Sequence, residues 1–125
     1  MADHFYISFY LRTNTIYIFC GVLREIGQPK YIRFLLNADG TKIIVQPYDR
    51  KEFTSFRVPT DIYHSEYVGR RSFRIQSKAL CMLLALRLGW DKSKSYRVPG
   101  TFFSNQKAMC FDLEKGKITG GNDSC

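Results

Sequence analysis

The sequence predicts an α+β fold that is mainly β, namely a pseudo-twofold barrel built from two strand-helix-hairpin repeats. The segment Arg70–Phe111 reads as one complete unit of strand, helix, strand, turn and strand. The segment Thr15–Tyr48 shows the same succession of elements, with little identity. The aligned positions are Ile18 with Ile75, Gly27 with Gly89 and Ile44 near Met109. Fusion of an ancestral dimer explains such a repeat, and a coincidental likeness of two ordinary segments is the alternative.

The first half is predicted to begin with two strands. Aromatic and branched residues alternate along residues 5–11, which is typical of a strand. This stretch has no basic leader, no long apolar run and no small-residue cleavage site, so we interpret it as neither a signal peptide nor a membrane span. Residues 12–15 predict a turn, and the alternation of Ile and aromatic side chains over residues 16–19 predicts the second strand.

A short helix and a hairpin complete the first half. Residues 22–26 carry apolar side chains at helical spacing, and the Gly-Gln-Pro run that follows ends this helix. Residues 31–36 and 42–46 are predicted to pair as a hairpin because Asp39-Gly40 between them favours a tight turn. We expect Pro47 to end the second of these strands.

The second half repeats this order with a longer helix. Ser77 occupies the position of a helix N-cap, and Gly89 closes the helix because glycine adopts a left-handed conformation at little cost. Trp90 is expected to fold back and cover the last turn. Pro99-Gly100 is expected to interrupt the strand that follows. The predicted elements are a strand over residues 72–75, a helix over 79–88, a strand over 96–98, a turn at 104–105 and a strand over 108–113.

The chain is predicted to be one domain, because each half alone has too little apolar surface for a stable core. The predicted domain covers residues 1–114. It contains repeat one at 5–47, a connecting segment at 48–69 and repeat two at 70–113, and a tail follows at 115–125. Residues 53–58 are predicted to be the leading strand of the second half, and residues 59–69 a surface loop of the kind that often contacts a partner. The tail is expected to be flexible because it has little to bury.

Composition favours a binding protein over an enzyme. The four cysteines are far apart, which predicts buried free thiols with an exposed thiol in the tail, no metal site and a reducing, cytoplasmic compartment. Phosphate-binding glycine motifs are absent, so no nucleotide cofactor is predicted. Asp61, His64, Ser65 and Glu66 are neighbours in sequence, but adjacency alone provides no catalytic geometry. We therefore expect no enzymatic activity.

Positive charge is concentrated in one part of the chain. The formal net charge is +8, and residues 70–97 contain eight Lys and Arg against a single acid, Asp91. Such a concentration is typical of a surface that binds a polyanion such as nucleic acid. A solvated basic face without a ligand and an acidic protein partner are the alternatives. Tyr17, Tyr63, Tyr67 and Trp90 are candidates for stacking on unpaired bases, although half-buried packing is the more common role of such residues.

The repeat resembles the small DNA-binding unit of the AbrB/MazE/SpoVT family, whose members interlock two copies into a swapped-hairpin barrel. The residues that carry the resemblance are Thr15-Ile16-Tyr17-Ile18, Val22 to Gly27, Tyr31 to Phe34 and Asp39-Gly40 to Pro47 in the first half, and Phe73-Arg74-Ile75 and Leu80 to Gly89 in the second. Most of the chain is covered. The chain departs from the family pattern after the last Ile of the leading strand, where Phe19 and Gln76 stand in place of Pro.

The resemblance implies that basic residues on and just before the strand leading into each helix face duplex DNA. These are Arg12 in the first half and Arg70, Arg71 and Arg74 in the second. Clustered guanidiniums bind phosphates in bidentate fashion and reach guanine edges. With the basic residues that follow, the predicted nucleic-acid-binding set is Arg12, Arg70, Arg71, Arg74, Lys78, Lys92, Lys94 and Arg97.

Two functions therefore remain as hypotheses. The first is an AbrB-like DNA-binding protein, either a transcriptional regulator or an antitoxin-like factor, whose affinity falls steeply with salt. The second is a non-catalytic interaction or inhibitory module that presents the loop Ile62–Val68 to an acidic protein. The sequence leaves open the DNA site, the protein target, the oligomeric state and whether the repeats pair within one chain or between chains.

Overall fold

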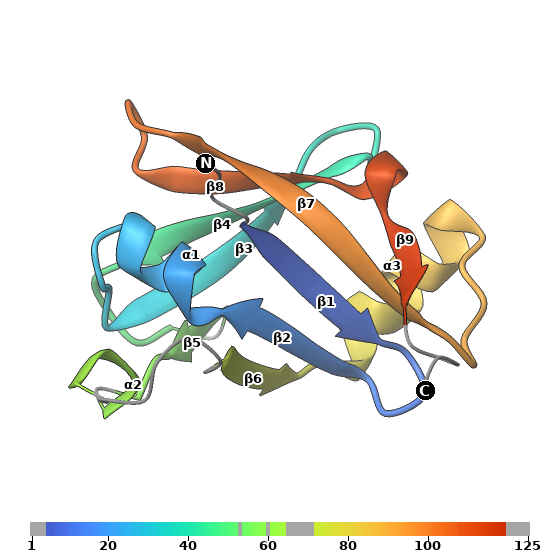
Figure 1. Ribbon diagram of the computed structural model, residues 1–125, viewed down its shortest axis with the longest axis horizontal. Helices are drawn as coiled ribbons and strands as arrows, with labels where there is room; N and C mark the ends of the chain where they lie inside the picture. The colour runs from blue at the N-terminus through green and yellow to red at the C-terminus, as the bar shows by residue number, and fades with distance from the viewer. Residues whose placement is uncertain (1–4, 53, 60, 65–71, 120–125) are drawn as a thin grey trace.

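The computed structural model describes residues 5–52, 54–59, 61–64 and 72–119. Within these ranges the fold is mainly β, and antiparallel strands curl into a nearly closed barrel with few helices (Figure 1). The strands are β1 Tyr6–Tyr10, β2 Thr15–Phe19, β3 Tyr31–Leu36, β4 Lys42–Tyr48, β5 Ser55–Arg57, β6 Ser72–Gln76, β7 Ser95–Phe103, β8 Ala108–Asp112 and β9 Lys117–Thr119. The helices are α1 Cys20–Glu25, α2 Asp61–His64 and α3 Lys78–Leu88, with a 3-10 turn, η1, at Leu113–Lys115. In these ranges, no helix has the length and apolar character needed to cross a membrane.

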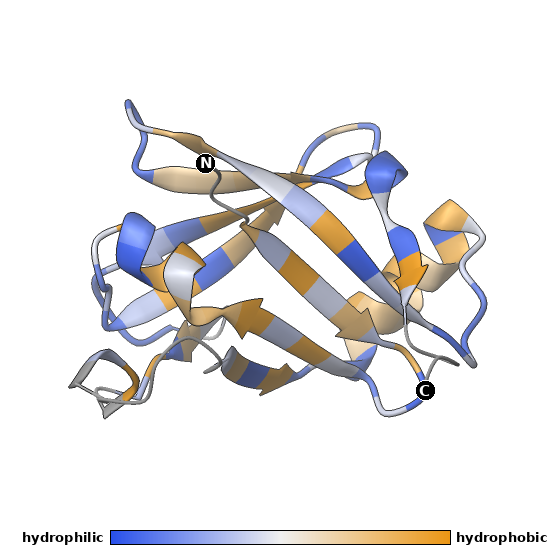
Figure 2. Cartoon of the chain, viewed as in Figure 1, coloured by the Kyte–Doolittle hydropathy of each residue, from blue (hydrophilic) through white to orange (hydrophobic). Residues whose placement is uncertain are grey.

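Strands from both halves of the sequence alternate around the sheet. The hydrogen-bonded order is β5-β3-β4-β8-β7-β1-β2-β6, with β9 added on β7. The first half pairs with the second at three places, namely β1 with β7, β2 with β6 and β4 with β8. The buried side chains of all these strands meet in one apolar core inside the barrel. Figure 2 shows the alternation of hydrophobic and hydrophilic residues along β1, β2 and β7 that places one face of each strand in this core.

Strand β7 joins the two parts of the sheet, and the predicted interruption at Pro99-Gly100 is wrong. Residues Ser95–Pro99 pair with β1, whereas Gly100–Phe103 pair with β8. Pro99 is tolerated because it lies between the residues of β7 that pair with β9, Ser95–Arg97, and those that pair with β8, Gly100–Phe103. On this edge of β7, no neighbouring strand needs the N–H that proline lacks. Gly100 is required there, since an added Cβ would lie 2.5 Å from the Phe111 ring.

Strand β4 also passes through a proline, which corrects a second expectation. Pro47 pairs with Ile32 of β3, and the strand continues to Tyr48. The pairing of β4 with β8 covers Lys42–Val45, so Pro47 lies beyond it, where one edge of β4 needs no donor. The predicted hairpin of β3 and β4 is confirmed, with Gly40 at φ +74° in its turn.

Both predicted caps of α3 are confirmed. The Ser77 hydroxyl accepts a hydrogen bond from the backbone N–H of Leu80 at 3.2 Å. Gly89 ends the helix with φ 68° in the left-handed region. Trp90 then stacks on Tyr96 with ring centroids 4.3 Å apart and packs against the core, as predicted.

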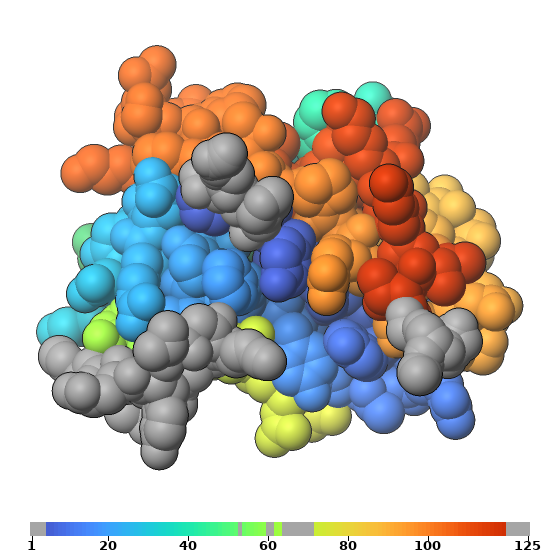
Figure 3. Space-filling model, in the orientation of Figure 1, coloured from blue at the N-terminus to red at the C-terminus, as the bar shows by residue number. Residues whose placement is uncertain are grey.

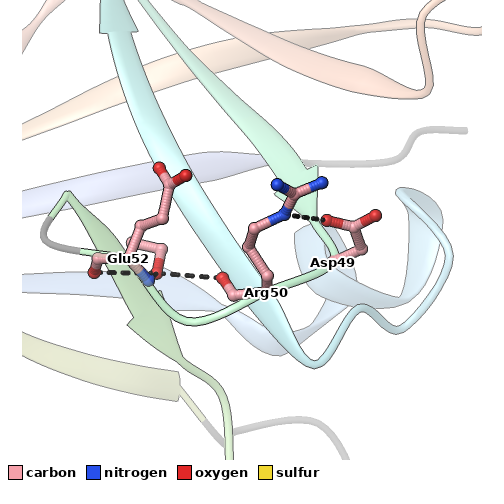
Figure 4. A network of polar contacts seen from close by, with 4 residues as sticks. Asp49, Arg50 and Glu52 are labelled. Atoms are coloured by element: carbon pink, nitrogen blue, oxygen red, sulfur yellow. Dashed lines mark hydrogen bonds and ion pairs between the residues drawn. The ribbon is translucent and has the colours of Figure 1, made fainter.

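The connection between β4 and β5 is held by short-range polar contacts (Figure 4). The Ser55 hydroxyl donates to the carbonyl of Arg50 at 3.2 Å and accepts from the N–H of Glu52 at 2.8 Å. Arg50 also contacts Asp49, but this ion pair is strongly exposed and contributes little stability. The turn therefore places β5 beside β3 through backbone and hydroxyl contacts.

The segment after Lys115 was expected to have nothing to bury, yet part of it is a strand. Lys117 pairs with Arg97, and Thr119 pairs with Ser95. Gly116 brings the chain close to Trp90 and Val98, because an added Cβ would meet both side chains within 3.2 Å. The expectation of a flexible tail is thus wrong for β9, and residues 120–125 lie outside the described residues.

Candidate nucleic-acid interface

The outer face of the sheet formed by β6, β2, β1, β7 and β9 carries a continuous row of polar and basic residues. Directly paired residues of antiparallel strands project to the same face. The register places these residues side by side in the order Arg74, Tyr17, Ser8, Arg97 and Lys117. The two arginines and the lysine are exposed. Strands β1, β2, β7 and β9 of this sheet face the reader in Figure 1.

Arg97 is oriented by two aromatic rings on the same face. Its guanidinium lies 4.3 Å from the centroid of the Tyr6 ring, and Tyr6 is stacked on Phe19 with centroids 5.3 Å apart. A guanidinium over an aromatic face is held by electrostatic attraction to the ring and keeps its N–H groups free at the edges. Arg97 is therefore preorganised to donate hydrogen bonds outward.

A hollow of about 460 Å³ opens next to this arginine. Its basic lining is Arg97, Lys115 and Lys117, and Phe5 and Tyr6 supply its aromatic side. Figure 3 shows the segment of η1 and β9, coloured red, as a raised rim along one side of the face. Cationic groups beside aromatic rings form a surface suited to phosphates and bases.

The charged side chains of the strands that form this face are all positive. The strands β6, β2, β1, β7 and β9 contain Arg74, Arg97 and Lys117 but no Asp or Glu within their bounds. Among the described residues, the one ion pair joins Arg50 and Asp49 on another part of the surface. No carboxylate of the described chain therefore neutralises these cations, which leaves their charge available to an anionic ligand.

The predicted site residues separate into three groups. Arg74 and Arg97 lie on the row just described. Arg12 and Lys94 line a second hollow, of about 460 Å³, at the end of the same sheet, where the N–H of Leu11 donates to the Lys94 carbonyl at 3.4 Å. Lys78 begins α3 and Lys92 follows its end, so both belong to the surroundings of that helix. Arg70 and Arg71 lie outside the described residues.

Sequence reasoning missed three members of the face, namely Tyr6, Lys115 and Lys117. The two lysines were assigned to a mobile tail, although the alternation Lys117-Ile118-Thr119 is a weak strand signal. Tyr6 lies within the first predicted strand, residues 5–11, and nothing in the sequence indicated a role for it. Its stacking with Phe19 and Arg97 depends on the pairing of three strands, which the sequence alone does not reveal.

Of the other candidate aromatic residues, Tyr63 and Tyr17 pack against neighbouring residues, and Tyr67 lies outside the described residues. The Tyr63 hydroxyl donates to the Pro29 carbonyl at 2.8 Å, and burial together with Cys20 raises the pKa of this hydroxyl. Ile62 is 5% exposed. Ile62 and Tyr63 of the proposed protein-binding loop therefore pack inward, and residues 65–68 of that loop lie outside the described ranges. Tyr17 lies edge-on to Tyr10 with centroids 5.0 Å apart and stays half-buried on the candidate face.

The cysteines of the described chain are free thiols, as predicted for Cys20 and Cys81, which are buried. Burial raises the pKa of the Cys81 thiol to about 11, so it stays protonated at neutral pH. Cys110 is partly exposed, and burial also raises its pKa. No cluster of three metal-ligating side chains occurs in the part of the chain that the structure describes.

The face therefore presents Arg74, Arg97 and Lys117 in one row with Tyr17, an arrangement whose charge is complementary to an anionic polymer. Comparison with protein-family models, with curated proteins and with solved structures found no match.

Proposed function

We propose that this chain is an AbrB-like DNA-binding protein, a transcriptional regulator or antitoxin-like factor, that binds duplex DNA through the outer face of β6, β2, β1, β7 and β9. The observation that carries the proposal is the row of Arg74, Tyr17, Arg97 and Lys117 on five strands that contain no Asp or Glu within their bounds. Phosphate contacts by Lys and Arg supply most of the affinity of DNA-binding proteins.

The spacing of the two arginines supports a duplex as the ligand. Arg74 and Arg97 are separated by three strand-to-strand steps, from β6 through β2 and β1 to β7. At about 4.8 Å for each step, their backbones are about 14 Å apart. The major groove of B-DNA is about 12 Å wide. The backbone spacing of the two arginines is therefore of the same order as the width of one groove.

Strand pairing supports the swapped-hairpin repeat that this proposal includes. A twofold relation that aligns Ile18 with Ile75 also aligns Ile16 with Phe73. If Ile18 pairs with Phe73, the relation therefore requires Ile75 to pair with Ile16, and both pairs occur between β2 and β6. The same test works for the hairpins. Aligning Ile44 with Met109 requires both Ile44–Cys110 and Val45–Met109, and both occur between β4 and β8. The strand order is also compatible with this twofold relation. The relation matches β1 with β5 and β7 with β3, and both corresponding pairs, β1 with β7 and β5 with β3, are present in the sheet.

The proposal is tested by fluorescence anisotropy with a labelled random duplex over a salt series. The variant Arg74→Ala/Arg97→Ala removes two charges from the face, and the control Arg50→Ala/Arg57→Ala removes two from the region of β5. We expect the first variant to lower the log-log salt slope by about 1.8 in magnitude, because each lost phosphate contact contributes about 0.9. The control should keep the wild-type slope. Equal slopes for both variants, or no binding by the wild-type protein at low salt, would contradict the proposal.

A further inference from the structure

Helix α3 carries apolar residues on two faces, although one face is enough to hold it on the barrel. Its inner face buries Cys81, Leu84 and Ala85 in the core. A second apolar stripe, at the spacing i, i+3, i+4 and i+7, consists of Ala79, Met82, Leu83 and Leu86. Figure 2 colours much of this helix as hydrophobic. A helix that is apolar all round is normally covered on both sides.

The second stripe is open to solvent. Met82 is 42% exposed, Leu83 39% and Leu86 82%. These side chains line a groove of about 590 Å³ that extends to Trp90 and Lys92 beyond the end of the helix. Such a groove matches the way an amphipathic helix inserts its apolar side chains into a partner. Exposure of three large side chains at helical spacing is costly unless a partner covers them.

The rim of this groove is basic. Lys78 begins the helix, Arg87 lies in its last turn and Lys92 lines the groove, whereas the helix itself contains no acid. The nearby Asp91 carboxylate accepts hydrogen bonds from the N–H and the hydroxyl of Ser93, at 2.9 and 2.7 Å. Lys92 in the lining of the groove and Lys78, next to Ala79 of that lining, are therefore the cations that face a ligand here, with one engaged carboxylate beside Lys92, which is complementary to an acidic ligand.

We propose that the outer face of α3 is a docking surface for an acidic amphipathic helix of another protein. Leucine-like side chains of that helix occupy the groove at Met82, Leu83 and Leu86, and its carboxylates meet Lys78 and Lys92. A second copy of this chain fits poorly, because it would bring two sets of the same cations together. The end of the chain, residues 120–125, does not supply the apolar ligand, since its sequence is Gly-Gly-Asn-Asp-Ser-Cys.

This surface is independent of the proposed DNA interface. The DNA interface uses the outer face of the sheet, with Arg74 and Arg97, whereas the groove is built from α3 and the residues that follow it. In Figure 1, α3 lies at the end of the molecule opposite α1 and α2. The same molecule can therefore hold a partner on the helix while its sheet binds another ligand, and each surface can be disabled separately.

The test uses a fluorescein-labelled helical peptide of about five turns with Leu on one face and Glu elsewhere, titrated with the full chain. A matched peptide with Lys in place of Glu is the charge control. We expect the Glu peptide to bind and the Lys peptide not to bind. Leu86→Glu should weaken binding by roughly tenfold or more, because it removes a buried leucine contact and adds repulsion. Leu86→Ala, which adds no charge, should weaken it to a smaller extent.

Three further variants complete the test. Lys78→Glu/Lys92→Glu should also abolish preference for the acidic peptide, whereas Leu35→Glu on β3 and Arg74→Ala/Arg97→Ala should bind as the wild type does. Circular dichroism checks that each variant is folded. The proposal is overturned if the Glu peptide does not bind, if both peptides bind equally, or if Leu86→Glu has no effect. It is also overturned if sedimentation velocity shows a wild-type dimer that Leu86→Glu dissociates, since a second copy would then cover the face.

Discussion

Tyr6 is the residue whose role differs most from what its position in the chain suggests. It carries no charge, yet its ring supports the guanidinium of Arg97 at 4.3 Å and rests on Phe19. A cation–π contact at an exposed site contributes about 0.5–1 kcal/mol. Tyr6 therefore acts on the proposed interface by orienting another side chain, and its effect is separable from an effect of charge.

We predict that Tyr6→Leu weakens the binding of duplex DNA by roughly two- to fivefold while the salt dependence stays unchanged. The affinity falls because Arg97 loses its support, and the salt slope stays because the number of cations is the same. Anisotropy titrations at several salt concentrations measure both quantities. Tyr48→Leu is the matched control, since the Tyr48 ring, on β4 and outside the proposed interface, supports the Arg33 guanidinium at 4.5 Å. A changed slope in Tyr6→Leu, or an equal loss in both variants, would contradict this role.

The roles that were easiest to predict were those of single residues whose interactions involve only their neighbours in the sequence. Ser77 and Gly89 were identified as the caps of α3 because capping depends on neighbours within one turn. Arg74 and Arg97 were named as candidate contacts because charge is visible in the sequence. That they share one row with Lys117 was not predictable, since this depends on the register of β6, β2, β1, β7 and β9.

At the scale of elements, signals carried by neighbouring residues were reliable and signals carried by a single proline were not. The hairpin of β3 and β4 was predicted from alternation and from Asp39-Gly40. Pro47 and Pro99 were expected to end or interrupt strands. Each lies at a position where no neighbouring strand is paired along one edge, so the N–H that proline lacks is not needed there. Whether a proline breaks a strand depends on which edge is paired, and that is a property of the whole sheet.

Strand β9 provides the prediction that belongs to this scale. We expect a chain that ends after Gly116 to be less stable than one that ends after Thr119, by roughly 1–3 kcal/mol, because the backbone bonds of β9 to β7 are lost. Urea denaturation followed by tryptophan fluorescence measures the difference, since Trp90 stacks on Tyr96, the partner of Ile118. If the two truncated chains have equal stability, β9 contributes nothing to the fold.

At the scale of the whole molecule, the mainly β class was predictable and the route of the strands was only partly so. Alternation along the sequence indicates strands, but it does not state which strands become neighbours. The pairs β1 with β7, β2 with β6 and β4 with β8 each join residues far apart in sequence. The candidate face exists because these long-range pairs bring Arg74 and Arg97 onto one sheet.

The same long-range pairs predict how the chain behaves when it is divided. Cutting between residues 52 and 53 separates β1, β2, β3 and β4 from their partners β7, β6, β5 and β8, so four ladders and the shared core are lost at once. We expect fragments 1–52 and 53–125 to lack a cooperative thermal transition when alone, because neither encloses enough apolar surface. Mixed in equal amounts, they should regain the transition and the near-ultraviolet signal of stacked Trp90 and Tyr96. A cooperative transition in either isolated fragment would mean that one half buries its own apolar face, contrary to the pairing of the halves around one core.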